Sequence, residues 1–95
     1  MMNMEKIIVK VLGPEIPCRN CTTTQKNVEE AVKRLAFPDF EFDVRHDYIA
    51  SEENVEKFGR LRSPATVAND YVLFQGEVPP VEKIVKKLED LVNLL

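Results

Sequence analysis

In the first third of the chain, an apolar run is followed by a break and then by the apolar spacing of a helix. Residues 6–12, KIIVKVL, are β-branched and nearly continuous in apolar character, which is typical of a strand covered on both faces. Residues 13–17, GPEIP, cannot continue a central strand because they hold a glycine and two prolines. A helix with one buried stripe should follow from about residue 20 to 35. Its apolar positions are Val28, Ala31, Val32 and Leu35.

This first helix should begin at or just after Cys18. Its first turn contains three threonines in succession, at residues 22–24, which lose side-chain freedom in a helix. We therefore expect a ragged polar start that faces solvent.

The middle of the chain predicts a half-buried strand and a short helix. At residues 40–45 aromatic or aliphatic side chains alternate with charged ones, the period of a strand with one covered face. Ser51 then offers an N-cap, acidic residues follow it, and Gly59 offers a stop. We expect a short helix between them, with Val55 and Phe58 facing the core.

The end of the chain predicts a hairpin and a closing helix. The apolar runs 65–68 and 71–74 are joined by Asn69 and Asp70, which tolerate the positive φ of a tight turn. Pro80 stands near the first turn of the last helix. One face of that helix is apolar and should be buried. It carries Val81, Ile84, Val85, Leu88, Leu91, Val92 and Leu95.

The predicted order is β-α-β-α-β-β-α, which places the chain in the α/β class. The first two strands are joined through a helix and should be parallel, while the last two form an antiparallel hairpin. A mixed four-stranded sheet flanked by helices should result. The chain has 95 residues, no internal repeat and no low-complexity linker, so we expect a single domain over residues 1–95.

Composition and charge exclude some partners. The net charge is -3, the sequence pI is near 5.2, and lysine and arginine form no dense cluster, so nucleic acid is not an expected partner. No apolar stretch approaches the roughly 18 to 20 residues of a membrane span. Residues 1–6, MMNMEK, lack the pattern of a secretory signal. We therefore expect a cytoplasmic protein with no membrane partner, and a disordered start at Met1, Met2 and Met4 rather than a thioether metal site.

The two cysteines, the only ones in the chain, lie three positions apart in PCRNC, residues 17–21. In a reducing compartment such a pair is usually catalytic or metal-binding. Cys18 at a helix N-terminus would have its thiolate stabilised by unpaired N–H groups and the helix dipole, helped by Arg19 and opposed by Glu15. Cys21, one turn further, could then attack a mixed disulfide formed at Cys18.

Metal ligation is the main alternative for this pair. Structural zinc needs about four ligands, whereas the chain offers two sulfurs and one histidine, His46, at the far end of the second predicted strand. A soft metal needs only two thiolates, but its carriers typically end on a strand, and this chain ends on a helix. We therefore expect no metal or other cofactor and assign His46 no role. Soft-metal binding or a protein-interaction module without redox turnover remains the alternative.

The chain as a whole resembles the thioredoxin superfamily, especially its small thioredoxin-like and glutaredoxin-like redox proteins. The matching features are the apolar first strand, Cys18-Arg19-Asn20-Cys21 opening a helix, and Ser63-Pro64 before an apolar strand, a hairpin and a closing helix. The resemblance implies a thioredoxin-like fold and a thiol-disulfide oxidoreductase with a catalytic cysteine pair. The departures are the absence of tryptophan, the residues between the sulfurs, and a first strand without the acidic residue that thioredoxins bury beneath the second cysteine.

The resemblance also implies a cis Ser63-Pro64 bond beside the cysteines, where an extended substrate segment can pair with the backbone. Pro17, Arg19, Ser63 and Pro64 are therefore the substrate-binding candidates. The expected partners are protein or small-molecule disulfides, with a disulfide reductase or glutathione as electron donor.

Three arginines fall near the predicted proline loop. Arg45, Arg60 and Arg62 would either form a positive rim around the substrate site or be solvated surface charges. Their positions in the sequence do not decide between the two.

Overall fold

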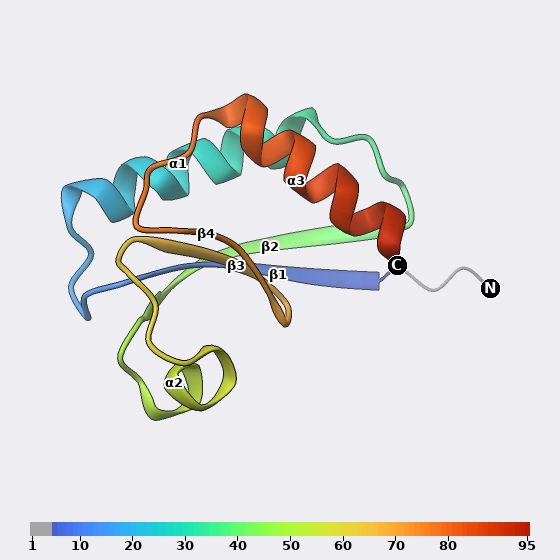
Figure 1. Ribbon diagram of the computed structural model, residues 1–95. Coiled ribbons are helices and arrows are strands. Elements are labelled where there is room, and N and C mark those ends of the chain that lie inside the picture. The colour runs from blue at the N-terminus through green and yellow to red at the C-terminus, as the bar shows by residue number, and fades with distance from the viewer. Residues whose placement is uncertain (1–4) are drawn as a thin grey trace.

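The computed structural model describes residues 5–95, which form a four-stranded sheet with helices on both faces (Figure 1). The expectation for Met1, Met2 and Met4 lies outside the described residues. The elements are β1 (Glu5–Gly13), α1 (Arg19–Arg34), β2 (Phe40–Tyr48), α2 (Glu52–Phe58), β3 (Ala65–Ala68), β4 (Tyr71–Gln75) and α3 (Val81–Leu94).

The sheet has the predicted mixed topology. Its strand order is β2-β1-β3-β4, in which β1 is parallel to β2 and antiparallel to β3, and β3 is antiparallel to β4. The predicted order β-α-β-α-β-β-α is confirmed. Because β1 and β2 are parallel, their carboxyl ends lie at the same edge, where Gly13 pairs with Tyr48. Within the described residues no helix is long and apolar enough to span a membrane.

Helices α1 and α3 cover one face of the sheet, and α2 covers part of the other (Figure 1). The larger apolar core lies under α1 and α3, and it includes Ile7, Val9, Val11, Cys21, Val28, Ile84 and Leu88, none of which is exposed. A smaller cluster on the opposite face contains Leu12, Ala65 and Val67 with Phe58 and Leu61 packed against it. The strand β1 is therefore buried on both faces only near its carboxyl end, since Ile8 and Lys10 are half-buried.

The first turn of α1 differs from the prediction. Thr22 and Thr23 are exposed as expected, but Thr24 is completely buried. Its hydroxyl donates a hydrogen bond of 2.7 Å to the carbonyl oxygen of Asn20 within the helix. Because its polar group is satisfied locally, the side chain can face the sheet one turn beyond Cys21.

The predicted hairpin is confirmed, but the predicted buried face of the closing helix extends too far, because it included Leu95. Asn69 has a positive φ of 50°, and its side-chain oxygen accepts a hydrogen bond of 2.9 Å from the N–H of Ile8. Pro80 is the N-cap of α3, whose apolar face is buried through Val92. Leu95 follows the helix as its C-cap and is 55% exposed, so it does not belong to the buried face.

The short helix α2 has the predicted caps but a different buried residue. The Ser51 hydroxyl accepts a hydrogen bond of 3.2 Å from the N–H of Asn54, and Gly59 ends the helix with a positive φ of 74°. Val55 and Phe58 are half-buried, whereas Asn54 is almost completely buried. The Asn54 amide donates to the carbonyl oxygen of Tyr48 at 2.7 Å and to the Asp47 carboxylate at 3.1 Å. This amide therefore fixes α2 to the end of β2.

We expect Asn54→Ala to lower the free energy of unfolding by about 1 to 3 kcal/mol, because the almost completely buried Asn54 amide donates the two hydrogen bonds that fix α2 to the end of β2. Denaturant unfolding measures this loss, and Glu56→Ala on the exposed face of α2 is the control. Burial would raise the pKa of Asp47, but Asn54, the Tyr48 N–H and Lys10 together hold that pKa below its ordinary value. Stability gained this way is lost as the pH falls through the folded pKa, so the difference between wild type and variant should shrink in acid. Equal losses for Asn54→Ala and Glu56→Ala would contradict this role.

Candidate functional site

The two cysteines lie together at the start of α1. Cys18 is the N-cap residue and is exposed, while Cys21 in the first turn is completely buried. Their sulfur atoms are 3.3 Å apart, and both are free thiols. The sequence therefore placed both residues correctly relative to the helix. Because Cys18 precedes the first helical residue, its sulfur lies among N–H groups that have no partner within the helix.

The thiols have pKa values shifted in opposite directions. The backbone N–H of Cys21, then the Cys21 thiol, and to a smaller extent the N–H of Asn20 lower the pKa of Cys18. None of these groups belongs to Arg19 or Glu15, the two side chains that the sequence suggested. Burial raises the pKa of Cys21, and negative charge on Cys18 adds to that increase. The pair thus combines an accessible thiol that ionises readily with a protected thiol that stays protonated.

We expect alkylation of Cys18 to show an inflection below the value of about 8.5 for a free cysteine. The thiolate is present above the folded pKa and is lost as the pH falls through it, so a lowered pKa extends reactivity toward neutral pH. Mass spectrometry of peptides after timed iodoacetamide treatment measures each cysteine separately. Arg19→Gln should leave the inflection nearly unchanged, because backbone N–H groups dominate the shift. An inflection at or above that of a free thiol would overturn this assignment.

The sulfur of Cys21 lies against Gly13, the last residue of β1. A Cβ atom at Gly13 would overlap Cys21 Sγ and lie 3.5 Å from Ser63 Oγ. The Gly13 carbonyl also accepts a hydrogen bond of 2.8 Å from the N–H of Ile49, which holds the strand end in place. From the sequence, Gly13 was only part of a break in the first strand. A glycine that ends a central strand shortly before a cysteine pair was the available signal for this contact.

The segment before β3 brings Ser63 and Pro64 to the same site. The Ser63-Pro64 bond is cis, as the resemblance implied, and Pro64 is buried while Ser63 is exposed. The Ser63 hydroxyl lies on the Cys21 side of this segment and lowers the pKa of that thiol, which offsets part of the increase caused by burial. The N–H of Gly76 contacts the carbonyl oxygens of Arg62 and Pro64, each at 2.9 Å, so the end of β4 supports this segment.

The other predicted site residues are placed as follows. Pro17 and Arg19 flank Cys18 and are exposed. Arg45 is held by Asp43 in an ion pair of 2.6 Å, so it is not free to form a positive rim. Among residues 5–95 neither Arg60 nor Arg62 makes an ion pair, and both lie on the segment that enters Pro64.

The potential for metal binding rests on the two thiols. Within residues 5–95 no group of three or more histidine, cysteine or acidic side chains is arranged to hold a metal ion. His46 lies in β2 opposite Val11, and its Nε2 atom is buried without a hydrogen-bond partner. The residues next to the Cys21 sulfur are thus Gly13 and Ser63 rather than additional metal ligands.

Comparison with known proteins supports the interpretation of this site. No curated protein matches the chain. The protein-family model described as "Thioredoxin domain" matches residues 7–89. The match runs from β1 into α3 and includes both cysteines and the cis-proline. The resemblance inferred from the sequence is confirmed: this chain belongs to the thioredoxin domain family and has a thioredoxin-like fold.

Proposed function

We propose that this protein is a thiol-disulfide oxidoreductase in which Cys18 and Cys21 alternate between dithiol and disulfide. One observation carries the proposal: an exposed thiol with a lowered pKa lies 3.3 Å from a buried thiol with a raised pKa. A disulfide has a sulfur-sulfur distance of about 2.05 Å, so a small movement of one side chain joins the two atoms.

The exchange takes place in two displacement steps. The Cys18 thiolate attacks one sulfur of the substrate disulfide, and the other sulfur leaves as a thiolate that takes up a proton. Cys21 then loses its proton and attacks Cys18 Sγ, which releases the second substrate sulfur as a thiol. The substrate gains two electrons and two protons, and the protein is left with a Cys18-Cys21 disulfide.

The residues around the sulfurs have distinct proposed roles in this reaction. Ser63 is exposed beside Cys21, and Pro17 and Arg19 are exposed beside Cys18, so these three can touch a bound substrate. Pro64 is buried, and its contribution is to hold Ser63 in place next to the sulfur. Ser63 can also stabilise the Cys21 thiolate during the second step by donating its hydroxyl proton in a hydrogen bond.

Turnover requires a reductant for the oxidised protein. We propose a disulfide reductase or glutathione as the electron donor and protein or small-molecule disulfides as the substrates. A cytoplasmic location suits this cycle, because that compartment keeps thiols reduced.

Equilibration in buffers of graded reduced and oxidised glutathione tests the proposal. We expect reversible two-electron oxidation of Cys18 and Cys21, with no metal bound to the purified protein, and a midpoint that gives the reduction potential. Reduction of a protein disulfide by catalytic amounts of the protein, with glutathione as reductant, is the second expected result. A stoichiometric soft metal and no turnover would instead favour the metal-binding alternative.

A further inference from the structure

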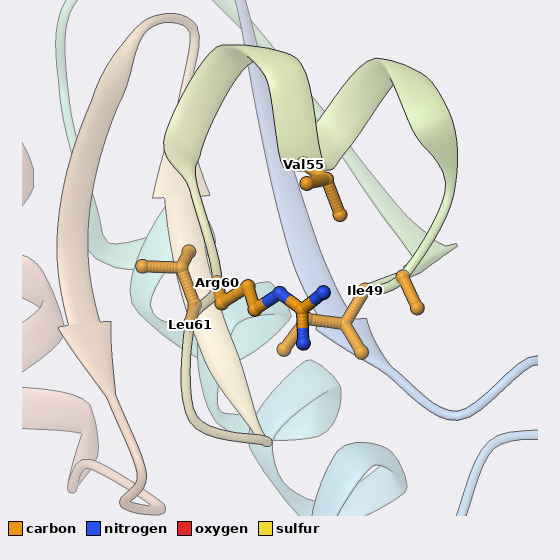
Figure 2. A pocket seen from close by; sticks show the side chains of 5 residues that line it. Ile49, Val55, Arg60 and Leu61 are labelled. Carbon is orange, nitrogen blue, oxygen red and sulfur yellow. The ribbon is translucent and has the colours of Figure 1, made fainter.

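A pocket of about 340 Å³ lies between the end of β2, the helix α2 and the segment that leads to β3 (Figure 2). Its lining consists of Ile49, Ala50, Val55, Arg60 and Leu61. Four of these residues are apolar, and Arg60 is the one charged member. The pocket therefore offers an apolar floor with a single positive group.

The pocket is connected to the dithiol site through the end of β1. Ile49 in its wall donates a hydrogen bond of 2.8 Å to the carbonyl oxygen of Gly13, and Gly13 is the residue against which Cys21 Sγ rests. Leu61 belongs to the apolar cluster under α2 and lies two residues before Ser63. The pocket therefore lies beside the end of β1 and the segment that carries Ser63, the two parts of the chain next to the Cys21 sulfur.

The charge at the pocket is not neutralised within the protein. Among residues 5–95 no acidic side chain forms an ion pair with Arg60, even though the helix α2 contains three glutamates. Figure 2 shows the Arg60 side chain extending between Leu61 and Ile49. Arg62 and Arg19 do not line the pocket, and they also make no ion pair with the described residues. This local positive charge occurs in a chain of net charge -3, so it is a property of the site rather than of the whole surface.

We propose that this pocket is a specificity subsite for disulfide substrates that carry an apolar side chain and a carboxylate next to the reacting cysteine. The apolar side chain fills the space between Ile49, Val55 and Leu61, and the carboxylate pairs with Arg60. The preferred substrates are then acidic peptide disulfides, whether they belong to a protein or to a short peptide. This inference rests on the proposed oxidoreductase function.

Short peptides activated as 2-pyridyl disulfides test the subsite, because release of pyridinethione reports attack on the peptide sulfur. Cys-Leu-Glu, Cys-Leu-Gln and Cys-Leu-Lys differ in charge, and Cys-Gly-Glu lacks the apolar side chain. We expect the Glu peptide to react about 3 to 10 times faster than the Lys peptide at low ionic strength, and salt should reduce this ratio. An acidic protein domain whose exposed cysteine is activated as a 2-pyridyl disulfide in the same way distinguishes a protein source from a short peptide.

Two variants and a matched control show whether the preference for the acidic, apolar peptide arises at this pocket. Arg60→Gln should bring the ratio close to one, whereas Arg34→Gln, the same change at the far end of α1, should leave it as in the wild type. Ala50→Leu places a larger side chain at an exposed lining position and should slow Cys-Leu-Glu to the rate of Cys-Gly-Glu. A ratio that persists in Arg60→Gln, or equal rates for all charged peptides, would overturn the subsite.

The outcomes separate this inference from the proposed function. If the peptides react through Cys18 without any preference, the oxidoreductase stands and the subsite is wrong. If no peptide reacts through Cys18, the proposed function is wrong. Binding of the S-methylated peptides then tests whether the pocket recognises the apolar side chain and the carboxylate. NMR shifts at Ile49, Val55 and Leu61 that are larger with the Glu peptide than with the Lys peptide would support the pocket, and equal or absent shifts would overturn it.

Discussion

Replacing Cys18 by serine should abolish disulfide exchange, whereas replacing Cys21 by serine should stop the reaction halfway. A serine hydroxyl at position 18 is not ionised near neutral pH, so we expect the rate of substrate reduction to fall on the order of a thousandfold or more. With serine at position 21, Cys18 still attacks, but nothing inside the protein resolves the mixed disulfide. A covalent adduct between Cys18 and the substrate should therefore accumulate.

The adduct is measured by non-reducing gel electrophoresis and intact mass after incubation with a protein disulfide. In the wild type the second step is intramolecular, and a well-oriented neighbouring group acts at an effective concentration far above that of any added thiol. The wild-type adduct should therefore be transient, while the Cys21→Ser adduct should persist until a reductant is added. Adduct formation by Cys18→Ser through Cys21 would reverse the two roles. Circular dichroism and thermal unfolding of both variants establish that they fold.

The fold could be predicted from the sequence because its main elements each carry a strong local pattern. Residues 28–35 and 81–92 have the apolar spacing of amphipathic helices, and both became helices over the same face of the sheet. The hairpin could be found although β3 has only four residues, because Asn69 supplies the positive φ that its turn needs. Local pattern and tertiary packing agree in these elements, so nothing in the rest of the chain overrides the pattern.

The burial of polar residues in the core could not be predicted in the same way. Asn54 looks like an ordinary surface residue of α2, and its burial depends on acceptors at Asp47 and Tyr48 that reach it only after the helix packs. Thr24 is buried because its hydroxyl bonds within the helix, an outcome that composition does not reveal. The pairing of Arg45 with Asp43 did have a signal, since residues two apart on a strand share a face.

The residues of the candidate site also differ in whether the sequence could predict them. A motif reveals the cysteines and the proline, because their identity and order along the chain are what define it. The resemblance also names Ser63, but only contacts between elements reveal Gly13 beneath a sulfur and Arg60 over an apolar pocket. The sequence names these residues without showing that the end of β1 brings them together.

Gly13→Ala should damage both the stability of the protein and the second step of the exchange. The added methyl group would overlap Cys21 Sγ at a position where strand and helix are both buried. Overpacking of this kind typically costs about 1 to 3 kcal/mol, and the sulfur can relieve it only by moving away from its place opposite Cys18. We therefore expect a lower free energy of unfolding for the reduced protein and a longer-lived mixed disulfide with substrate. Urea unfolding and quenched-flow mass analysis measure the two effects.

A double-mutant cycle shows whether this loss comes from the sulfur contact. Cys21→Ala removes Sγ, so Gly13→Ala in that background should cost less than in the wild type, with a coupling energy of about 1 to 3 kcal/mol. An equal cost in both backgrounds would place the damage in the backbone of β1 or at Ser63, and the glycine would then have no specific relation to the thiol. A coupling in the expected range would mean that the strand end is shaped to hold the resolving sulfur. The glycine would then be as much a part of the site as the two cysteines that the motif reveals.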